Sequence, residues 1–367
     1  MKKVLLRDIC KIEKGKQIDT NLLDATNKYK YINGGIKESG MYFKFNTNAN
    51  TVIVSEGGVS CGYVNYVEEN FWCGCHCYRL LNPTIEPKYL YYVLKGNQKK
   101  IMDLKTGAAM PNIKKSSFQS LVLSIDNNKK HQDEIIYNLD KISSTIKLKT
   151  NQLILLDELI KSRFIEMFGD PNVNPKKWPN GKINDIAKCV VGATPKTSID
   201  EYWNNGTIPW LSSGEVNKYK IYDTDKKITQ LGYKHASAKM IPAHTVVLAI
   251  AGQGKTRGTV AISEIELCTN QSICSLVNNS KVNAEFLLFY LKFQYDELRM
   301  ASNGAKGRGG LNLKIIGAFP IFIPPMELQN KFAELVKQVD KLKFIVQEQI
   351  NNLQELFDKK MDEYFGE

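Results

Sequence analysis

The stretch HQDEIIYNLDKISSTIKLKTNQLILLDELIKSRFIEMFG, residues 131–169, decides the fold of this chain. Its apolar residues recur at alternating steps of four and three, which is the seam pattern of a coiled coil. No Pro or Gly interrupts the pattern before Gly169–Pro171 ends it. It predicts one helix of roughly 38 residues, on the order of 57 Å long. The seam positions are Ile135, Leu139, Ile142, Ile146, Lys149, Leu153, Leu156, Ile160, Arg163 and Met167.

The same pattern returns at the end of the chain, shifted by 197 positions. The shift places Arg163 on Lys360, so even the basic interruption is repeated. Two such helices, each closing a similar block, predict an internally duplicated protein. The second seam consists of Phe332, Val336, Val339, Lys343, Val346, Ile350, Leu353, Phe357, Lys360 and Tyr364.

The two blocks ahead of the helices also repeat. Residues 31–35 resemble residues 210–214, and residues 51–54 resemble residues 245–248, at offsets of 179 and 194. Short β-branched runs separated by Gly and Asn turns predict strands in both blocks. The changing offset indicates loops of different length on one scaffold.

The fold class that these patterns predict is α+β. Two similar mixed α/β domains are each followed by a long helix, and the two helices pack as an antiparallel coiled-coil spacer. The predicted boundaries are residues 1–127 for the first domain, 128–170 for the central helix, 171–325 for the second domain and 326–367 for the last helix.

Composition limits the class of protein. A chain of 367 residues is too long for one hydrophobic core, so two or more domains are expected. No run of 18 apolar residues predicts a membrane span. The first residues, MKKVLLRDICKIEKGK, do not have the apolar core of a signal peptide. The eight cysteines are therefore expected to be free thiols in a reducing cytoplasm.

The net charge of +12 is unevenly distributed along the chain. The blocks at residues 1–127 and 171–325 carry +7 and +8, whereas the helices at 128–170 and 326–367 carry 0 and −3. A polyanion such as double-stranded DNA would therefore bind the blocks, which leaves the helices for protein contacts. A basic protein without such a partner is the alternative that charge alone leaves open.

The most conspicuous motif is AIAGQGKT at residues 249–256, after a predicted strand at 245–249. It fits a relaxed Walker A pattern, but a true P-loop must open a helix that holds the phosphates. The β-branched residues after Arg257 predict another strand instead. A glycine-rich hairpin that points Lys255, Thr256 and Arg257 at a phosphate backbone explains the motif better, and a nucleotide-binding enzyme stays as an alternative.

Basic, glycine-rich loops precede the last strand of both blocks, at residues 105–115 and 302–314. Small residues let the backbone approach a phosphate closely. A solvated turn is the alternative for either loop, but a basic loop at the same place twice favours nucleic-acid contact. The candidate DNA-binding residues are Lys105, Asn112, Lys114, Lys115, Lys255, Thr256, Arg257, Lys306, Arg308 and Asn312.

Nothing in the sequence predicts catalysis or a bound metal. Cys73, Cys75 and Cys77 alternate in what reads as one strand, which would place three sulfurs on one face where they cannot converge on zinc. We expect them to pack as small apolar residues. Neither block has a glycine-rich adenosylmethionine loop, an Asn-Pro-Pro-aromatic motif or a nuclease-like pair of carboxylates. The chain is therefore expected to be non-catalytic and to bind no cofactor of its own.

The pattern resembles the DNA specificity subunits of type I restriction–modification systems. The resemblance rests on LDELIKSRFIEMFGDP at residues 156–171 and on IPPMELQ at residues 323–329. Residues 124–126 depart from it because they lack the prolines, although Gln132 is kept. With the order block, helix, block, helix, the resemblance covers essentially the whole chain.

The resemblance implies that each block is a target recognition domain for one half of a bipartite DNA sequence. Two modification subunits would dock on the helices and supply adenine-N6 methylation with S-adenosylmethionine, and restriction subunits would join for cleavage. A stand-alone bipartite DNA-binding protein is the other reading. The helix positions we predict to bind partners are Leu153, Leu156, Ile160, Phe164, Ile350, Leu353, Phe357 and Tyr364.

Overall fold

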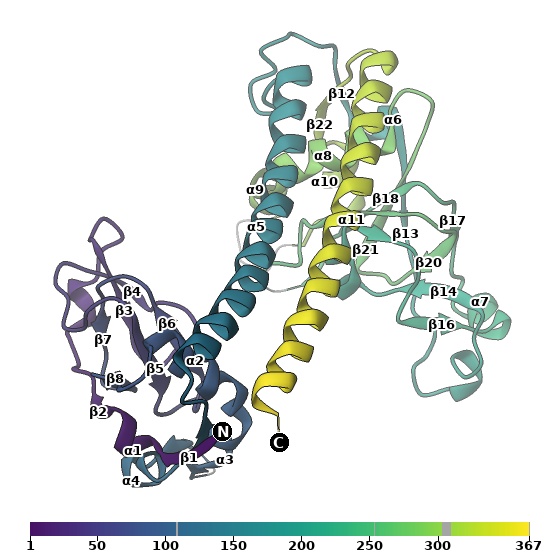
Figure 1. Cartoon of the computed structure of the whole chain (residues 1–367). Coiled ribbons are helices and arrows are strands. Elements are labelled where there is room, and N and C mark those ends of the chain that lie inside the picture. Colours follow the sequence, from purple (N-terminus) through teal and green to yellow (C-terminus); the bar gives the residue numbers. More distant parts are fainter. Residues whose placement is uncertain (108, 253, 303–309, 367) are drawn as a thin grey trace. The chain divides into compact units, whose positions relative to one another are not determined.

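The computed structural model of the chain describes residues 1–107, 109–252, 254–302 and 310–366 (Figure 1). The chain forms two compact units, Met1–Asn151 with Gln347–Glu367, and Gln152–Val346. Each unit contains one block and part of both long helices. Within the described residues, none of the helices combines the length and the apolar content that a membrane span needs.

The first unit contains a main sheet of four strands and a small sheet of three. Its strands are β1 (Lys2–Leu5), β2 (Lys11–Lys14), β3 (Tyr29–Ile32), β4 (Gly40–Tyr42), β5 (Thr51–Ser55), β6 (Val64–Val67), β7 (Trp72–Cys73), β8 (Cys77–Leu81), β9 (Lys105–Thr106), β10 (Asn112–Ile113) and β11 (Val122–Ile125). Its short helices are α1 (Leu6–Ile9), η1 (Thr20–Leu22), α2 (Pro87–Gly96), α3 (Gln98–Asp103) and α4 (Lys115–Gln119). The main sheet has the antiparallel order β2-β8-β5-β6, and the small sheet has the order β4-β3-β7.

The second unit repeats these elements with a larger main sheet. Its strands are β12 (Asn180–Lys182), β13 (Ala187–Val191), β14 (Ile208–Leu211), β15 (Lys220–Ile221), β16 (Lys226–Ile228), β17 (Met240–Ile241), β18 (Thr245–Ala249), β19 (Val260–Ser263), β20 (Leu267–Thr269), β21 (Ile273–Asn278) and β22 (Pro320–Phe322). Its short helices are α6 (Ile183–Ile186), η2 (Asp200–Tyr202), η3 (Ser213–Lys218), α7 (Gln230–His235), α8 (Ala284–Phe293), α9 (Tyr295–Ala301) and α10 (Leu313–Gly317). The sheet orders are β13-β21-β18-β19-β15 and β16-β14-β20-β17.

The shared topology confirms the predicted duplication. The order β2-β8-β5-β6 corresponds to β13-β21-β18-β19, and the parallel pair β3–β7 corresponds to the parallel pair β14–β20. Gly15 and Gly192, which match at an offset of 177, sit at the same close crossing in both. A Cβ at Gly15 would lie 2.2 Å from the carbonyl oxygen of Gly74, and one at Gly192 would lie 1.9 Å from that of Thr269. Only glycine fits at such a crossing.

The long helices are α5 (Lys129–Phe168) and α11 (Met326–Phe365), each uninterrupted as predicted. In the second unit Asp157 contacts Lys343, and Phe164 contacts Phe332. The later residue of α5 thus contacts the earlier residue of α11, so the two helices run antiparallel. In the first unit, Asn138 Nδ2 donates to Tyr364 Oη at 3.1 Å.

Aromatic packing joins the long helices of the second unit to its block. Phe164, Phe168 and Phe332 are fully buried, with ring centroids 5.0 to 5.5 Å apart. Phe286 of α8 stacks on Phe164 at 5.7 Å, so α8 lies against both helices. Burial of aromatic side chains of this size is among the largest stabilising contributions to a core.

The basic seam positions differ from the apolar ones. Arg163 and Lys360 do not enter the seam; each pairs at 2.7 Å with a glutamate three residues further along its own helix. The seam leucines of the middle region, Leu153, Leu156 and Leu353, are only half-buried, because two helices cannot enclose a side chain as fully as a block does.

The cysteine run does not form the single strand that the sequence predicts. β7 ends at Cys73, the chain turns through residues 74–76, and β8 begins at Cys77. Cys73 and Cys77 are buried and Cys75 is half-buried. Among the described residues, no group of three or more His, Cys, Asp or Glu side chains is placed to hold a metal ion.

Candidate nucleic-acid interface

The glycine-rich motif of the second block forms the tip of a hairpin. β18 ends at Ala249, the loop reverses the chain, and β19 returns antiparallel from Val260. The chain does not continue into a helix after Lys255, so the motif has no helix N-terminus to hold phosphates as a P-loop does. Lys255 is exposed, whereas Thr256 and Arg257 are half-buried.

Two side chains of α9 hold this hairpin loop in place. Tyr295 Oη donates to the carbonyl oxygen of Lys255 at 2.8 Å. Arg299 Nη1 donates to the carbonyl oxygens of Gly254 at 2.7 Å and Arg257 at 3.0 Å. Gly258 makes the turn with a positive φ of 89° directly against these two side chains. The backbone around Lys255 is therefore fixed by side chains remote in the sequence.

The described end of the other basic loop of this block, from Gly310 onward, lies beside the hairpin. Leu311 N donates to the carbonyl oxygen of Ile250 at 3.2 Å. Asn312 Oδ1 accepts from Ile315 N at 2.9 Å and caps α10, so this side chain has a structural role that the sequence prediction missed. Lys306 and Arg308 lie outside the described residues.

The first block builds the same arrangement. Its hairpin loop lies between β5 and β6, and its basic loop is itself a small hairpin of β9 and β10. Gly58 N donates to the carbonyl oxygen of Pro111 at 3.0 Å, and Ile113 N donates to that of Glu56 at 2.8 Å. In each block, then, a glycine-rich hairpin loop is hydrogen-bonded to a basic loop. We call the two loops together the loop pair: residues 56–63 with 105–115, and residues 250–259 with 310–312.

The loop pair of the first block presents its cations to solvent. Lys105, Lys114 and Lys115 are exposed, and so is Asn112. Thr106 Oγ1 donates to the carbonyl oxygen of Asn112 at 3.3 Å and keeps the two strands together at the tip. The structure therefore places these residues on the β9–β10 hairpin and the turn into α4 with the three lysines exposed, whereas Asn112 Oδ1 accepts from Thr106 Oγ1 at 3.4 Å.

An aromatic and basic cluster directly after β4 of the first block was not predicted from the sequence. Phe43 and Phe45 are 48% and 42% exposed, which is unusual for large apolar rings. Lys44 Nζ lies 5.2 Å over the Phe43 ring, and Tyr29 packs on Phe45 at 5.1 Å. Basic and aromatic side chains that alternate on a surface are suited to nucleic acid. The YFKF run at residues 42–45 is the signal that could have revealed it.

The predicted partner-binding positions fall into two groups. Ile160 and Phe164 are buried in the core of the second unit, so these side chains stabilise the fold and are not exposed to a partner. The other six, from Leu153 to Tyr364, are half-buried. The large apolar side chains of the helices that are exposed are Tyr137, Leu148, Ile154, Leu155, Leu159, Ile165, Leu342, Phe344, Ile345 and Leu356.

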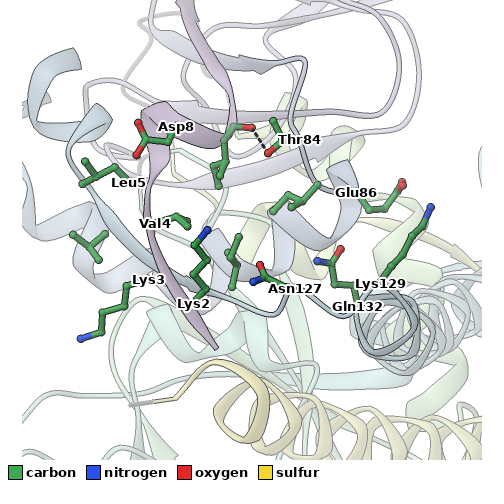
Figure 2. A pocket seen from close by; sticks show the side chains of 14 residues that line it. Lys2, Lys3, Val4, Leu5, Asp8, Thr84, Glu86, Asn127, Lys129 and Gln132 are labelled. Atoms are coloured by element: carbon green, nitrogen blue, oxygen red, sulfur yellow. Dashed lines mark hydrogen bonds between the residues drawn. The ribbon is translucent and has the colours of Figure 1, made fainter.

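A cavity of about 770 Å³ at the base of the first block holds none of the predicted residues (Figure 2). Its lining mixes cations such as Lys2 and Lys129 with the carboxylates of Asp8 and Glu86. The Thr84 hydroxyl donates to the carbonyl oxygen of Ile9 across its wall at 3.5 Å. Charges of both signs at one rim do not favour a polyanion.

Comparison with known proteins gives one consistent family. The family model described as type I restriction modification DNA specificity domain matches residues 1–158 and 175–355. A Mycoplasma genitalium protein named as a type I specificity subunit is 26% identical over 341 residues, covering 90% of this chain and 84% of the relative. A Mycoplasma pneumoniae protein with the same type of name is 25% identical over 380 residues, covering 99% and 95%.

Solved structures agree on the fold. The crystal structure of a type I restriction–modification S subunit from M. genitalium superposes with a TM-score of 0.67 at 21% identity, covering 98% of this chain and 94% of that one. A chain from a structure of type I complex assembly and conformational transition superposes with a TM-score of 0.59 at 15% identity, covering 99% and 97%. Because the family model matches both halves, the chain belongs to the type I restriction–modification DNA specificity family, whose role is recognition of the DNA target.

Proposed function

We propose that each block of this specificity subunit reads one half of a bipartite DNA target through its loop pair. The observation that carries the proposal is that the same two loops are hydrogen-bonded to each other in both blocks, through Ile113 to Glu56 and through Leu311 to Ile250. A reading surface that occurs twice in one chain is suited to a target with two half-sites.

We divide the candidate residues into positioning and reading roles. The exposed lysines are proposed to bind phosphate oxygens. For the first half-site these are Lys105, Lys114 and Lys115, and for the second half-site Lys255. Arg257 and Asn112 carry planar groups suited to a base edge, and Asn112 would first release the hydrogen bond that its Oδ1 accepts from Thr106 Oγ1 at 3.4 Å. Asn312 is assigned to holding α10 because its oxygen is already used. Thr256, Lys306 and Arg308 complete the proposed set for the second half-site.

The long helices are proposed to set the distance between half-sites and to dock two modification subunits. A helix of 40 residues is about 60 Å long, which exceeds one turn of DNA. Exposed apolar side chains such as Leu148 and Phe344, both 68% exposed, give such subunits a surface. The modification subunits would bind S-adenosylmethionine and methylate adenine N6, and restriction subunits would cleave the DNA. We propose that the complex acts in the cytoplasm and that this chain contributes no catalytic group.

Adenine methylation in the host genome tests the proposal. Deleting the gene should abolish N6-methyladenine at one bipartite motif, and restoring it should restore the same motif. A chain with Lys255→Ala and Arg257→Ala should weaken or relax only one half of the motif. The matched chain with Lys105→Ala and Lys114→Ala should affect only the other half. A methylation pattern that is the same with and without the gene would refute the proposal.

A further inference from the structure

A second cluster of cations lies away from the loop pairs, where the long helices of the second unit meet its block. A cavity of about 480 Å³ is lined by Lys161 of α5, Lys343 of α11 and Lys292 of α8, together with Tyr219 and Asp157. Its walls are otherwise aromatic and aliphatic. The long helices are neutral or acidic overall, so a pocket lined by three lysines and one aspartate is locally more basic than they are.

Two of the three cations, Lys161 and Lys292, are not neutralised by a carboxylate of the pocket lining. Lys343 Nζ lies 2.6 Å from Asp157 Oδ1, and that pair uses the only carboxylate in the lining. Within the part of the chain that the structure describes, Lys161 and Lys292 make no ion pair. Lys292 is exposed as a whole residue, but its ammonium group is partly enclosed by the pocket. Burial of this group, and then the nearby charges of Lys343 and Lys161, lower its pKa to about 8. A bound anion would relieve this repulsion.

The wall of the pocket is built rigidly. Lys292 Nζ lies 4.2 Å over the Tyr219 ring and Lys343 Nζ lies 5.6 Å over it. Tyr219 has a positive φ of 66° with ψ of −62°, a conformation that a non-glycine residue keeps only when its surroundings hold it. Ile262 N holds this backbone by donating to the carbonyl oxygen of Tyr219 at 3.0 Å, and Tyr219 Oη donates to Asp340 Oδ2 at 3.4 Å.

Exposed apolar side chains flank the cations on α5. Ile154 precedes Asp157 by three residues and Ile165 follows Lys161 by four, so each shares a helix face with a pocket residue. Their side chains are 54% and 38% exposed. A charged pocket with an apolar border is the surface that a protein with an acidic side chain among apolar ones would complement.

We propose that the pocket of Lys161, Lys292 and Lys343 receives a carboxylate side chain of one modification subunit. The proposal rests on the proposed docking of those subunits on the helices, and it names the chemistry at one point of contact. Lys161 and Lys292 supply the ammonium groups that would pair with the carboxylate. Lys343 is already paired with Asp157 and contributes only a longer-range electrostatic attraction.

The first unit does not repeat this pocket, although its fold is repeated. Lys95 occupies the position that matches Lys292 and lies 4.1 Å over the Tyr63 ring, but its Nζ donates to Gln98 Oε1 at 2.8 Å. The positions that match Lys161 and Lys343 at the offset of 197 hold Asp358 and Ile146. The two modification subunits would therefore dock at chemically different sites, and only one would depend on the lysines.

Stepwise binding of the purified modification subunit to the full chain, followed by native mass spectrometry and calorimetry, tests this. The variant Lys161→Ala with Lys292→Ala should weaken one of the two binding steps at least tenfold and leave the other unchanged. Lys161→Arg with Lys292→Arg should keep both steps. Lys95→Ala is the matched control in the first unit and Lys337→Ala the control on an exposed face of α11, and neither should alter the lysine-dependent step. Thermal unfolding of each variant checks the fold.

Carbodiimide cross-linking, which joins a carboxylate to an amine without a spacer, provides a second readout. Lys161 or Lys292 should be joined to an aspartate or glutamate of the modification subunit, and the double alanine variant should lose that product. If the wild-type chain binds two modification subunits but the variant binds them equally well, the pocket assignment is wrong while the proposed docking stands. Weakened DNA binding with intact subunit binding would likewise overturn it in favour of a phosphate site. A wild-type chain that binds no modification subunit would refute both.

Discussion

Lys220 of β15 and Asp340 of α11 form an ion pair of 2.9 Å that joins the second block to its long helix. Glu285 of α8 lies 2.7 Å from the same ammonium group. The first unit uses the same combination at different positions, because Lys88 lies 3.4 Å from Asp140 of α5. In both units a tyrosine hydroxyl also bonds the aspartate: Tyr219 for Asp340 and Tyr92 for Asp140. The block is thus attached to its helix by polar contacts as well as by the aromatic core.

Replacing Asp340 with Asn should destabilise the second unit by about 1–3 kcal/mol. The change keeps the shape but removes the charge that Lys220 and Tyr219 face at the edge of the core. Asp358→Asn is the matched control, since this aspartate is exposed further along α11 and faces Gln354. Denaturant unfolding followed by hydrogen exchange of β15 and α8 measures the difference. Equal stability of the two variants would show that the ion pair contributes nothing.

Replacing Phe332 with Ala should cost about 3–5 kcal/mol. The ring is fully buried and meets Phe164 and Phe168 edge-on, so its loss leaves a cavity between α5, α11 and α8. Phe344 on the same helix is 68% exposed, and Phe344→Ala should change stability by less than about 0.5 kcal/mol. Thermal and urea unfolding decide between them. Phe344→Ala should instead weaken binding of modification subunits, which a loss of stability alone would not explain.

The stability of the second unit should depend on pH through Lys292. Its pKa is lowered from 10.5 to about 8 in the folded chain, so between these values the unfolded chain binds more protons and stability rises with pH. The titratable side chains around it are Lys343, Asp157, Lys161, Asp340 and Tyr219. Lys292→Met should be more stable than the wild type at pH 7. Its free energy of unfolding should rise much less between pH 8 and 10 than that of the wild type does. Solvent screening keeps the effect modest. Urea unfolding at pH 7, 8, 9 and 10 measures it, and parallel curves for both chains would contradict the assignment.

Arg299 and Lys255 should affect DNA binding differently. Arg299→Ala removes the donors that hold the carbonyls of Gly254 and Arg257, so the loop loses its fixed shape and affinity should fall by about 1 kcal/mol. Because Arg299 positions the loop, the salt dependence of binding should hardly change. Lys255→Ala should reduce the salt slope by about one. Affinities at two salt concentrations separate the roles.

The control for this pair is Arg7→Ala, an exposed arginine of the first unit that pairs with Asp8 at 3.8 Å. It should leave recognition of the second half-site intact. If Arg299→Ala changes the salt slope as much as Lys255→Ala does, Arg299 contacts the phosphates itself and the positioning role is wrong.

The sequence by itself determined the elements that depend on local pattern. The four-three repeat at residues 131–169 and its shifted copy predicted both long helices, because residues three or four apart in sequence lie on the same face of a helix. The strand at residues 245–249 and the β-branched residues after Arg257 predicted a hairpin rather than a P-loop, as the structure has it. The shifted copy of the helix pattern and the matches of residues 31–35 with 210–214 and of residues 51–54 with 245–248 predicted the duplication.

Only the tertiary structure decided which distant residues meet. Asn312 reads in the sequence as a loop asparagine and caps α10 in the fold, and Arg299 reads as an ordinary helix residue and holds a loop more than forty positions away. The pocket of Lys161, Lys292 and Lys343 draws on three helices, and no local pattern encodes their approach. The predicted partner-binding set included Ile160 and Phe164, but both are buried, because the burial of a helix side chain depends on the block that packs over it. Periodicity specifies the face of a helix, but what covers that face is set by contacts between residues far apart in the chain.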